Sequence, residues 1–566
     1  MKNRYIFRIC EYSFFPSWKN HILQTNNFTN MQKSLLLGVE AIGQAAIDAG
    51  ISGVYAYPGT PSTEITEYIQ NNKLANSRKI HHEWSTNEKT ALEEALGMSY
   101  AGKRAMACMK HVGLNAAADI FMNMAITGVN GGLVVTVADD PSQHSSQNEQ
   151  DSRFYGKFAM IPVFEPSNQQ EAYDMTYAAF AFSEKTGLPV MMRIPTRLAH
   201  SRSGVIQQPV MPENNLHFPE NPIQFILLPA YGRKLYQSLI DKQDWMVELS
   251  EESTYNNYFE GKDKSLGIVC CGIAYNYLME NYPDNNCPYP VVKIGQYPLP
   301  KKMLKRLEQQ CDELFIAEEG FPLVEEMLSD FFEKGTKVSG RLNGALPRRG
   351  ELNPDHLAKA LGKEKVQPTS SPNILVGRPP SLCAGCGHKD TYEALNEIIA
   401  EVGTGRVFSD IGCYTLGALP PFNTINTCVD MGASITMAKG AADAGLTPVF
   451  AIIGDSTFTH SGITGLLDCV VEKTNINIII VDNEAVAMTG GQSSAAKGRI
   501  EKICEGVGVD PTHIRLFVPL KKNHDEIVSV IREEMTFNGV SVIIGRRECV
   551  QRIAKLKKLN RTNKEV

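Results

Sequence analysis

Val449-Phe-Ala-Ile-Ile-Gly454 and Ile476-Asn-Ile-Ile-Ile-Val481 are two short apolar runs, typical of parallel strands that are buried on both faces. A stretch of helical character separates them, so the segment predicts one β-α-β unit. Asp455 follows the first strand and Asn483 follows the second. Because open α/β sheets bind ligands at the carboxyl ends of their strands, these two side chains should lie together at such a site. Their hard oxygen atoms suit Mg²⁺ held against a diphosphate, and an ordinary β-α-β unit with polar strand ends is the alternative.

Length and composition describe an ordinary folded protein. The 566 residues carry a net charge of −6, with 43% hydrophobic and 21% charged residues. The length predicts about three to four domains, and the acidic balance argues against a nucleic-acid partner. No apolar run reaches the roughly 18–20 residues of a membrane span, and the first 30 residues lack a secretory signal. We therefore expect a cytoplasmic protein whose residues 1–31 are a disordered extension or an upstream start artefact.

The polar strand ends resemble half of a known cofactor site. The Gly454-Asp455 start and its separation from Asn483 resemble the metal–diphosphate motif of thiamine diphosphate enzymes. In those enzymes the third protein ligand of the Mg²⁺ is the carbonyl two residues past the Asn, which here is Ala485. The resemblance therefore implies a magnesium–diphosphate clamp made of Asp455, Asn483 and Ala485.

A second motif resembles the other half of that site. Glu88, followed by Ala91 and Gly97, resembles a helix of the pyrimidine-binding domain in thiamine enzymes. There a carboxyl group contacts the aminopyrimidine ring and activates its amino group, and Glu88 would supply it. Glu83 is a weaker candidate. The alternative for Glu88 is a solvent-facing glutamate that favours the helix dipole.

Three further motifs identify the branch of the superfamily. They are Tyr57-Pro-Gly-Thr60-Pro-Ser-Thr63, Met109-Lys-His111-Val-Gly-Leu-Asn115, and the polar segment 138–153, which ends in Arg153. Together they resemble the 2-oxoacid:ferredoxin oxidoreductases, and within them the large (alpha) subunits of indolepyruvate ferredoxin oxidoreductases. The resemblance covers residues 32–549, nearly the whole chain.

The resemblance implies a multi-domain α/β fold, in which two doubly wound parallel-sheet domains flank a smaller transketolase carboxyl-terminal-like domain. The expected order is a pyrimidine-binding domain at 32–205, a linker segment at 206–264, the smaller α/β domain at 265–362, a linker at 363–377, a diphosphate-binding domain at 378–550 and a polar tail at 551–566.

The resemblance also implies site residues. Thr60 would bind the oxo or carboxylate group of the substrate, Arg153 would hold the carboxylate with its forked donors, and His111 would line the same pocket. A turn residue and a surface ion pair are the alternatives for Thr60 and Arg153. Further cofactor contacts are expected at Gly454 and Ser456, at Gly432, Ala433 and Ser434 through helix-start amides, at Met431 as an apolar wedge, and at Met488 and Thr489 over the diphosphate.

Four of the thirteen cysteines could serve a metal cluster. Cys383-Ala-Gly-Cys386 is compatible with zinc, disulfide exchange or an iron–sulfur cluster. Family resemblance favours one 4Fe-4S cluster, with Cys413 as third ligand and Cys549 as the fourth. The alternative is a structural turn without metal. Most other cysteines stand singly in apolar segments and are predicted to be reduced and buried.

The implied reaction is oxidative decarboxylation of 2-oxoacids, chiefly aryl pyruvates such as indolepyruvate, to acyl-CoA. It would use thiamine diphosphate, Mg²⁺ and coenzyme A, with ferredoxin as acceptor. A smaller beta subunit and a two-fold hetero-oligomer are also implied, in which different chains usually supply the two halves of each site. Family alpha subunits end in a ferredoxin-like domain, whereas no Cys-x-x-Cys repeat follows Cys549. A non-oxidative decarboxylase giving an aldehyde and a non-catalytic thiamine-binding scaffold are the alternatives.

Overall fold

A computed structural model describes residues 33–282, 284, 286–333, 335–363, 374 and 380–562. The expectation for residues 1–31 and most of the linker expected at 363–377 lie outside these residues. Among the described residues, no helix combines the length and the apolar character needed to cross a bilayer.

The carboxyl-terminal domain is built on a parallel sheet with the strand order β14 (Val407–Ser409), β15 (Phe450–Gly454), β16 (Ile476–Asp482), β20 (Val540–Arg546) and β19 (Ile514–Phe517). The predicted β-α-β unit is confirmed. From β15 the chain passes through α19 (Asp455–Thr457), a π-helical turn at 458–462 and α20 (Ile463–Val471) to β16. Gly454 pairs with Val481 in the parallel ladder, so Asp455 and Asn483 emerge at the same edge.

The amino-terminal domain carries a six-stranded sheet. Its order is β11 (Gln296–Tyr297), β5 (Val163–Phe164), β6 (Val190–Pro195), β4 (Leu133–Asp139), β3 (Ala105–Lys110) and β2 (Gly53–Ala56). All pairs are parallel except the edge pair of β11 with β5. Helices α5 (Glu88–Tyr100) and α9 (Gln169–Thr186) pack against this sheet. Strands β3, β4 and β6 are buried along their whole length, as continuous apolar runs predict.

The middle domain has a third sheet, ordered β13 (Lys337–Ser339), β12 (Glu313–Ala317), β9 (Leu266–Cys271), β10 (Val291–Ile294) and β8 (Asn257–Phe259). The segment 206–264, expected as a linker, contains α11 (Pro229–Asp241), α12 (Gln243–Glu251) and β8. Strand β11 comes from the middle domain but extends the amino-terminal sheet. These two domains are therefore joined by sheet pairing as well as by side-chain packing.

The remaining elements complete the layers around the sheets. They are β1 (Lys33–Leu37), α2 (Gly38–Asp48), α3 (Thr63–Asn71), α4 (Lys73–Ser77), α6 (His111–Ala116), α7 (Ala118–Thr127), α8 (Arg153–Ala159), α10 (Thr196–His200), β7 (Arg202–Ile206), α13 (Ala274–Glu280), α14 (Lys301–Gln310), α15 (Leu323–Ser329), α16 (Pro354–Ala360), α17 (Gly387–Val402), α18 (Ala433–Asp443), β17 (Ala485–Val486), β18 (Gln492–Ser493), α21 (Ile500–Gly506), α22 (His524–Met535) and α23 (Val550–Thr562).

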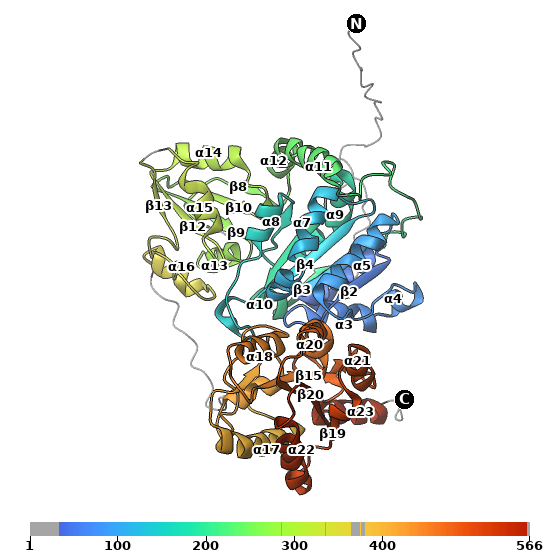
Figure 1. Ribbon diagram of the computed structural model, residues 1–566. Coiled ribbons are helices and arrows are strands. Elements are labelled where there is room, and N and C mark those ends of the chain that lie inside the picture. Colours follow the sequence, from blue (N-terminus) through green and yellow to red (C-terminus); the bar gives the residue numbers. More distant parts are fainter. Residues whose placement is uncertain are drawn as a thin grey trace.

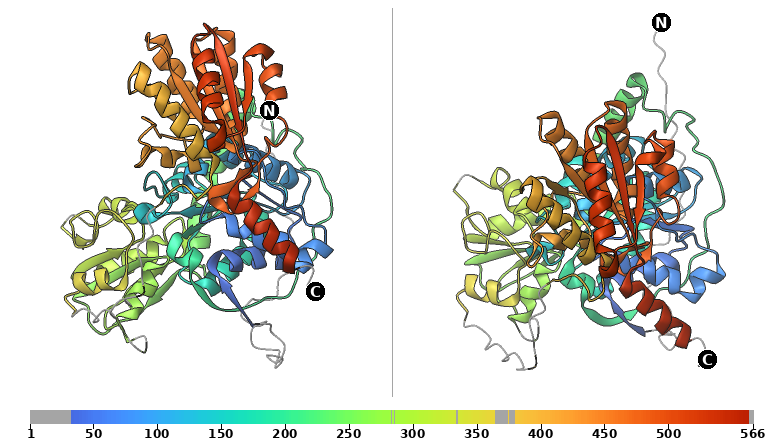
Figure 2. Two further views of the ribbon diagram at one scale, coloured as in Figure 1. Left: turned by 90° about the horizontal axis from the view of Figure 1, so that it is seen from below. Right: turned by 60° about the horizontal axis from the view of Figure 1, so that its bottom comes forward.

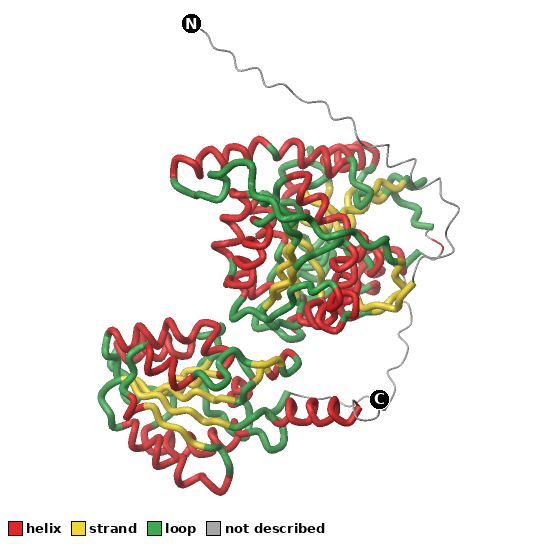
Figure 3. Tube along the Cα trace, turned by 90° about the vertical axis from the view of Figure 1, so that its right-hand side faces the viewer, coloured by secondary structure: helices red, strands yellow, loops and turns green. Residues whose placement is uncertain are grey.

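The amino-terminal and middle domains lie side by side, and in Figure 1 the carboxyl-terminal domain packs below them; Figure 2 shows the same arrangement from two other sides. Helix α23 occupies the stretch expected as a polar tail and projects from the carboxyl-terminal domain (Figure 3). Arg552 and Lys555 on this helix donate hydrogen bonds to the carbonyls of Glu484 (2.6 Å) and Gly490 (2.9 Å). The helix thus supports the loop that follows Asn483.

Candidate active site

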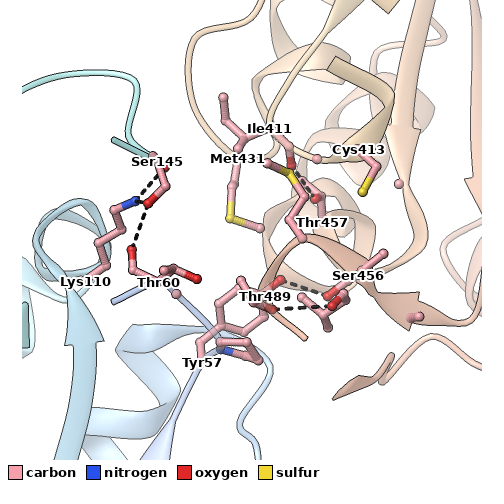
Figure 4. Close-up of a pocket in the computed structure, with 18 of the residues that line it drawn as sticks. Tyr57, Thr60, Lys110, Ser145, Ile411, Cys413, Met431, Ser456, Thr457 and Thr489 are labelled. Carbon is pink, nitrogen blue, oxygen red and sulfur yellow. Dashed lines mark hydrogen bonds between the residues drawn. The ribbon is translucent and has the colours of Figure 1, made fainter. Parts of the chain in front are cut away.

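One cavity lies between the amino-terminal and carboxyl-terminal domains (Figure 4). The amino-terminal wall includes Tyr57, Thr60, Glu88, Lys110 and Ser145, and the opposite wall includes Met431, Gly454, Asp455, Ser456, Asn483, Ala485, Met488 and Thr489. The two motifs that the sequence assigned to separate halves of a thiamine site therefore meet in one cavity. In this structure both halves come from a single chain.

Polar contacts across the domain boundary hold the two walls together. The hydroxyls of Tyr57 and Ser456 lie 2.8 Å apart, and Gln492 donates to the Glu67 carboxylate at 2.9 Å. The Tyr57 and His460 rings also make a T-shaped contact, with centroids 4.8 Å apart. These residues are about 400 positions apart in sequence, so only the tertiary structure brings them together.

Glu88 starts helix α5 and points into the cavity from a buried position. The Asn87 side chain caps this helix by accepting from the Thr90 amide at 2.8 Å. One Glu88 carboxylate oxygen lies 2.8 Å from Nε2 of His460 in the opposite domain. The Asn87 amide also donates to the His460 carbonyl at 3.1 Å. The carboxyl group is thus held by its own helix and by the facing domain.

Asp455 has the properties expected of a metal ligand. Its carboxylate is buried, and its Oδ2 atom has no hydrogen-bond partner among the described residues. Burial, reinforced by the negative charge of Asp482, raises the pKa of Asp455 to about 7. The raised pKa means that keeping this buried carboxylate ionised costs free energy. A bound divalent cation would offset that cost by giving the carboxylate a counter-charge.

The other expected Mg²⁺ ligands lie at the same cavity. Asn483 and Ala485 line it, and the Asn483 Oδ1 accepts from the Ala485 amide at 3.0 Å, which fixes the turn. Within the described ranges, no three His, Cys, Asp or Glu side chains are grouped to hold a metal ion. The expected set contains only one such side chain, because an amide and a backbone carbonyl complete it. The donors present therefore fit Mg²⁺.

The expected phosphate-binding helix start differs in detail. Met431 enters the cavity between its two walls (Figure 4). Gly432, Ala433 and Ser434 do not line the cavity. Ser434 donates its hydroxyl (2.5 Å) and its amide (3.3 Å) to the buried Asp410 carboxylate. Both of its donors are therefore engaged by Asp410 and do not face the cavity.

Arg153 lies outside the cavity. It is 1% exposed, at the boundary between the amino-terminal and middle domains. Its guanidinium contacts the carboxylates of Asp151 (2.5 Å) and Glu318 (2.9 Å) and the carbonyl of Phe321 (2.9 Å). Burial opposes the charge, but the surrounding carboxylates raise the pKa of Arg153 above its usual value. Arg153 therefore does not line the main cavity, where a substrate contact was expected. It joins two domains instead.

His111 is also displaced from its expected place. It begins α6, is 1% exposed, and does not line the cavity, whereas its neighbour Val112 does. Neither ring nitrogen has a hydrogen-bond partner among the described residues. The strand-to-helix turn therefore presents the backbone and an apolar side chain to the cavity, and keeps the imidazole inside the domain.

The four cysteines expected to bind a cluster line a second cavity. Cys383, Cys386, Cys413 and Cys549 come from the segment before α17, the helix start itself, the turn after β14 and the residue before α23. Burial raises the pKa of Cys386, and raises that of Cys413 to about 12, with further contributions from the neighbouring thiols. Forming thiolates at these buried positions therefore costs free energy, which iron ligation would offset.

The two cavities adjoin. Cys413, Asn483 and Ala487 line both of them. Four cysteine thiols are the donor set that a 4Fe-4S cluster takes, but among the described residues no three His, Cys, Asp or Glu side chains are grouped to hold a metal ion. His388 lines the cysteine cavity too, and burial lowers its pKa to about 4.

Sequence reasoning missed four residues of the main site. Tyr57 and Ser145 lay inside quoted motifs without an assigned role, and so did Lys110, which precedes His111. His460 lies five residues after Asp455, a proximity that could have drawn attention to it. Nothing in the sequence shows that it contacts Glu88.

Comparisons with known proteins agree with this geometry. The family model for pyruvate flavodoxin/ferredoxin oxidoreductase, thiamine diphosphate-binding, matches residues 44–225. The model for the carboxyl-terminal TPP-binding domain of thiamine pyrophosphate enzymes matches residues 410–544. The two models cover the two domains that form the main cavity.

Several curated relatives share most of their length with this chain. Indolepyruvate oxidoreductase subunit IorA of Archaeoglobus fulgidus is 38% identical over 550 residues, which cover 92% of this chain and 86% of that protein. The subunit of the same name from Pyrococcus abyssi is 38% identical over 586 residues (93% and 87%). The one from Methanothermobacter thermautotrophicus is 36% identical over 543 residues (92% and 87%).

A solved 2-oxoglutarate:ferredoxin oxidoreductase from Magnetococcus marinus, with 2-oxoglutarate, coenzyme A and succinyl-CoA bound, aligns with 59% of this chain and 65% of its own. Its TM-score of 0.47 and identity of 15% are too low to support an inference. The curated relatives, which match over most of their length, and the two matched domains are sufficient to assign the family. This chain belongs to the indolepyruvate oxidoreductase IorA family of thiamine diphosphate-dependent 2-oxoacid oxidoreductases, and it is an enzyme subunit of that class.

Proposed function

We propose that this subunit catalyses the oxidative decarboxylation of aryl pyruvates such as indolepyruvate, with acyl-CoA as product and ferredoxin as electron acceptor. The observation that carries the proposal is the single cavity between Glu88 on one domain and Asp455 and Asn483 on the other. The aryl preference and the acceptor rest on the family, whose members include the named indolepyruvate oxidoreductase subunits.

Each residue of the cavity has a task in this chemistry. Thiamine diphosphate, when bound, supplies a carbanion and an electron sink at its thiazolium ring. Glu88 would hold a proton at the aminopyrimidine nitrogen, and His460 fixes the orientation of that carboxyl group. Asp455, Asn483 and the Ala485 carbonyl would hold Mg²⁺ against the diphosphate. Met431, which enters the cavity between the two walls, would pack against the bound cofactor and so help to position it.

The cysteine cavity supports the oxidative step. Cys383, Cys386, Cys413 and Cys549 would hold a 4Fe-4S cluster, and such a cluster would supply one-electron transfer for the two-electron oxidation. Cys413 lines both cavities, so the electron path would be short. The electrons would pass to two oxidised ferredoxins, and the acyl group would pass to the coenzyme A thiol. This arrangement favours the oxidative reaction over aldehyde release.

Membership of the family implies a 2-oxoacid substrate and a smaller beta subunit. We propose that the two subunits form a hetero-oligomer with two-fold symmetry in the cytoplasm. Co-expression with the beta subunit, followed by light scattering, tests the assembly. A subunit that stays monomeric in the presence of its partner would contradict it.

The function is tested with the anaerobically purified complex. Calorimetry should detect binding of thiamine diphosphate with Mg²⁺, and indolepyruvate should drive reduction of ferredoxin only when coenzyme A is present. Release of an aldehyde without coenzyme A or ferredoxin would show a non-oxidative decarboxylase. Cofactor binding without turnover of any 2-oxoacid would show a non-catalytic scaffold.

Replacing Cys413 with Ser should remove the cluster while leaving the thiamine site loaded. Iron and sulfide content and the visible absorbance should fall to background, because one of four thiolate ligands is lost. Binding of thiamine diphosphate and Mg²⁺ should persist. Cys469→Ser is the matched control, since Cys469 is a buried thiol on α20 that lines neither cavity. Equal iron in both variants would refute the cluster assignment.

A methyl group at Gly113 should displace the Glu88 carboxylate. A Cβ there would lie 2.5 Å from a Glu88 carboxylate oxygen and 2.6 Å from its Cγ. We expect Gly113→Ala to lower kcat by about 10- to 100-fold, because displacements of this kind cost that much in positioned reactions. Gly97→Ala on α5 is the control, since no atom lies within 4 Å of its added Cβ. Full activity of Gly113→Ala would show that Glu88 needs no fixed position.

A further inference from the structure

The main cavity has an unusual charge balance for a site that takes an anion. Two of its lining residues, Glu88 and Asp455, bear carboxyl groups, and Lys110 is the only Lys, Arg or His among the described residues that line it. A 2-oxoacid brings a carboxylate of its own. A buried anion needs a counter-charge or several hydrogen bonds. The cavity itself offers one candidate for the counter-charge.

Lys110 stands at the carboxyl end of β3, on the amino-terminal wall and across the cavity from Met431 and Thr457 (Figure 4). Its side chain is 8% exposed. The ammonium nitrogen donates to the Ser145 carbonyl at 2.7 Å and lies 3.2 Å from the Ser145 hydroxyl. Both contacts are to one residue, which leaves an ammonium with three donors able to bind a further acceptor.

The nearest carboxylate does not need Lys110 as a partner. Asp140 lies 3.8 Å from the ammonium nitrogen. It already accepts from the Ser145 amide (2.8 Å), the Ser146 hydroxyl (2.5 Å) and the Thr196 hydroxyl (2.8 Å). Lys110 is therefore only loosely paired within the protein. Its position is fixed mainly by the loop that carries Ser145.

Two hydroxyl-bearing residues lie beside the ammonium group. Thr60 follows the turn after β2 and lines the same wall, and its carbonyl accepts from the Ser145 hydroxyl at 3.3 Å. Lys110, Ser145 and Thr60 thus form a polar cluster facing the Met431 side of the cavity (Figure 4). A carboxylate bound beside this cluster can accept a hydrogen bond from the Lys110 ammonium group.

We propose that Lys110 binds the carboxylate of the 2-oxoacid, with Ser145 and Thr60 beside it, in the place that the sequence had assigned to Arg153. This inference rests on the proposed function. A lysine can do this, because its compact ammonium group has three rotatable donors and can bind a carboxylate while it keeps its contacts to Ser145.

The protonation of Lys110 gives a second, independent readout. Burial lowers its pKa to about 8, while the nearby Asp140 opposes that shift. The facing residues from the other elements, Ser145, Thr60 and Gly59, are uncharged. The ammonium form is present below this pKa and is lost as the pH rises through it. Hence kcat/KM of the wild-type complex should fall as the pH rises above about 8.

The test is Lys110→Met in the assembled complex, with Lys110→Arg beside it. We expect KM for indolepyruvate to rise about 10- to 100-fold in Lys110→Met, the range of one hydrogen bond between charged groups. Lys110→Arg should recover part of the loss. KM for coenzyme A and the affinity for thiamine diphosphate with Mg²⁺ should not change. Lys293→Met is the control, since Lys293 is a buried lysine that pairs with Glu171 away from the cavity.

Inhibition of the wild-type complex tests the inference even if Lys110→Met does not fold. Indole-3-acetate should compete with the 2-oxoacid at least about ten times better than indole-3-acetamide, which lacks the charge. Equal inhibition by the two, an unchanged KM in Lys110→Met, or a rise only in KM for coenzyme A would overturn the assignment. A wild-type complex that turns over no 2-oxoacid would instead refute the proposed function.

Discussion

Replacing Glu88 with Gln is expected to lower turnover by about 10²–10⁴-fold, the contribution of a positioned acid–base group. The amide keeps the size of the side chain and can still contact His460, 2.8 Å away in the wild type. It cannot exchange a proton with the aminopyrimidine nitrogen. Because Glu88 lies on the domain opposite the clamp, binding of thiamine diphosphate and Mg²⁺ should persist in calorimetry.

The control for this variant is Glu83→Gln, which tests the weaker sequence candidate. Glu83 is exposed and does not line the cavity, so its variant should keep wild-type turnover. Unchanged kcat in Glu88→Gln, or a loss of turnover in Glu83→Gln alone, would show that Glu88 does not supply the catalytic carboxyl group. Loss of cofactor binding in Glu88→Gln would show that this residue serves affinity instead of proton transfer.

Asp455→Asn should abolish binding of the metal–cofactor pair, with apparent affinity falling by more than about 100-fold. Changes to groups that merely orient metal ligands already cost about 10- to 100-fold, and here the charged ligand itself is lost. The protein should still fold, because the variant removes a carboxyl group whose pKa burial raises to about 7. Calorimetry with Mg²⁺ and thiamine diphosphate measures the loss.

Asp468→Asn on helix α20 is the matched control for the clamp. Asp468 is exposed and lies outside both cavities, so its variant should bind the cofactor normally. Thermal unfolding adds a readout: Mg²⁺ with thiamine diphosphate should stabilise the control and leave Asp455→Asn unchanged, since only a bound ligand shifts the folding equilibrium. Wild-type affinity in Asp455→Asn would show that the Mg²⁺ ligands lie elsewhere.

Local sequence was sufficient to predict those features of the site that depend on residues near one another in the chain. Asp455 and Asn483 were predicted side by side because a parallel β-α-β unit leaves no other arrangement, and the pairing of Gly454 with Val481 confirms it. Glu88 was expected at a helix start, and the Asn87 cap places it there. Domain boundaries were harder to predict. Segment 206–264 was expected as a linker but contributes strand β8 to the middle sheet, because strand pairing depends on partners distant in sequence.

Apolar runs in the sequence predicted the parallel-sheet domains, and family resemblance implied the two motifs that line the main cavity and the four cysteines that line the second one. Only the tertiary structure decided which side chains face the cavity. Arg153 and Lys110 are both basic residues in family-like motifs, yet one is enclosed by carboxylates between two domains and the other lines the site. The reason is physical: the surroundings of a charge are set by domains that pack together from far along the chain, and no local pattern records them.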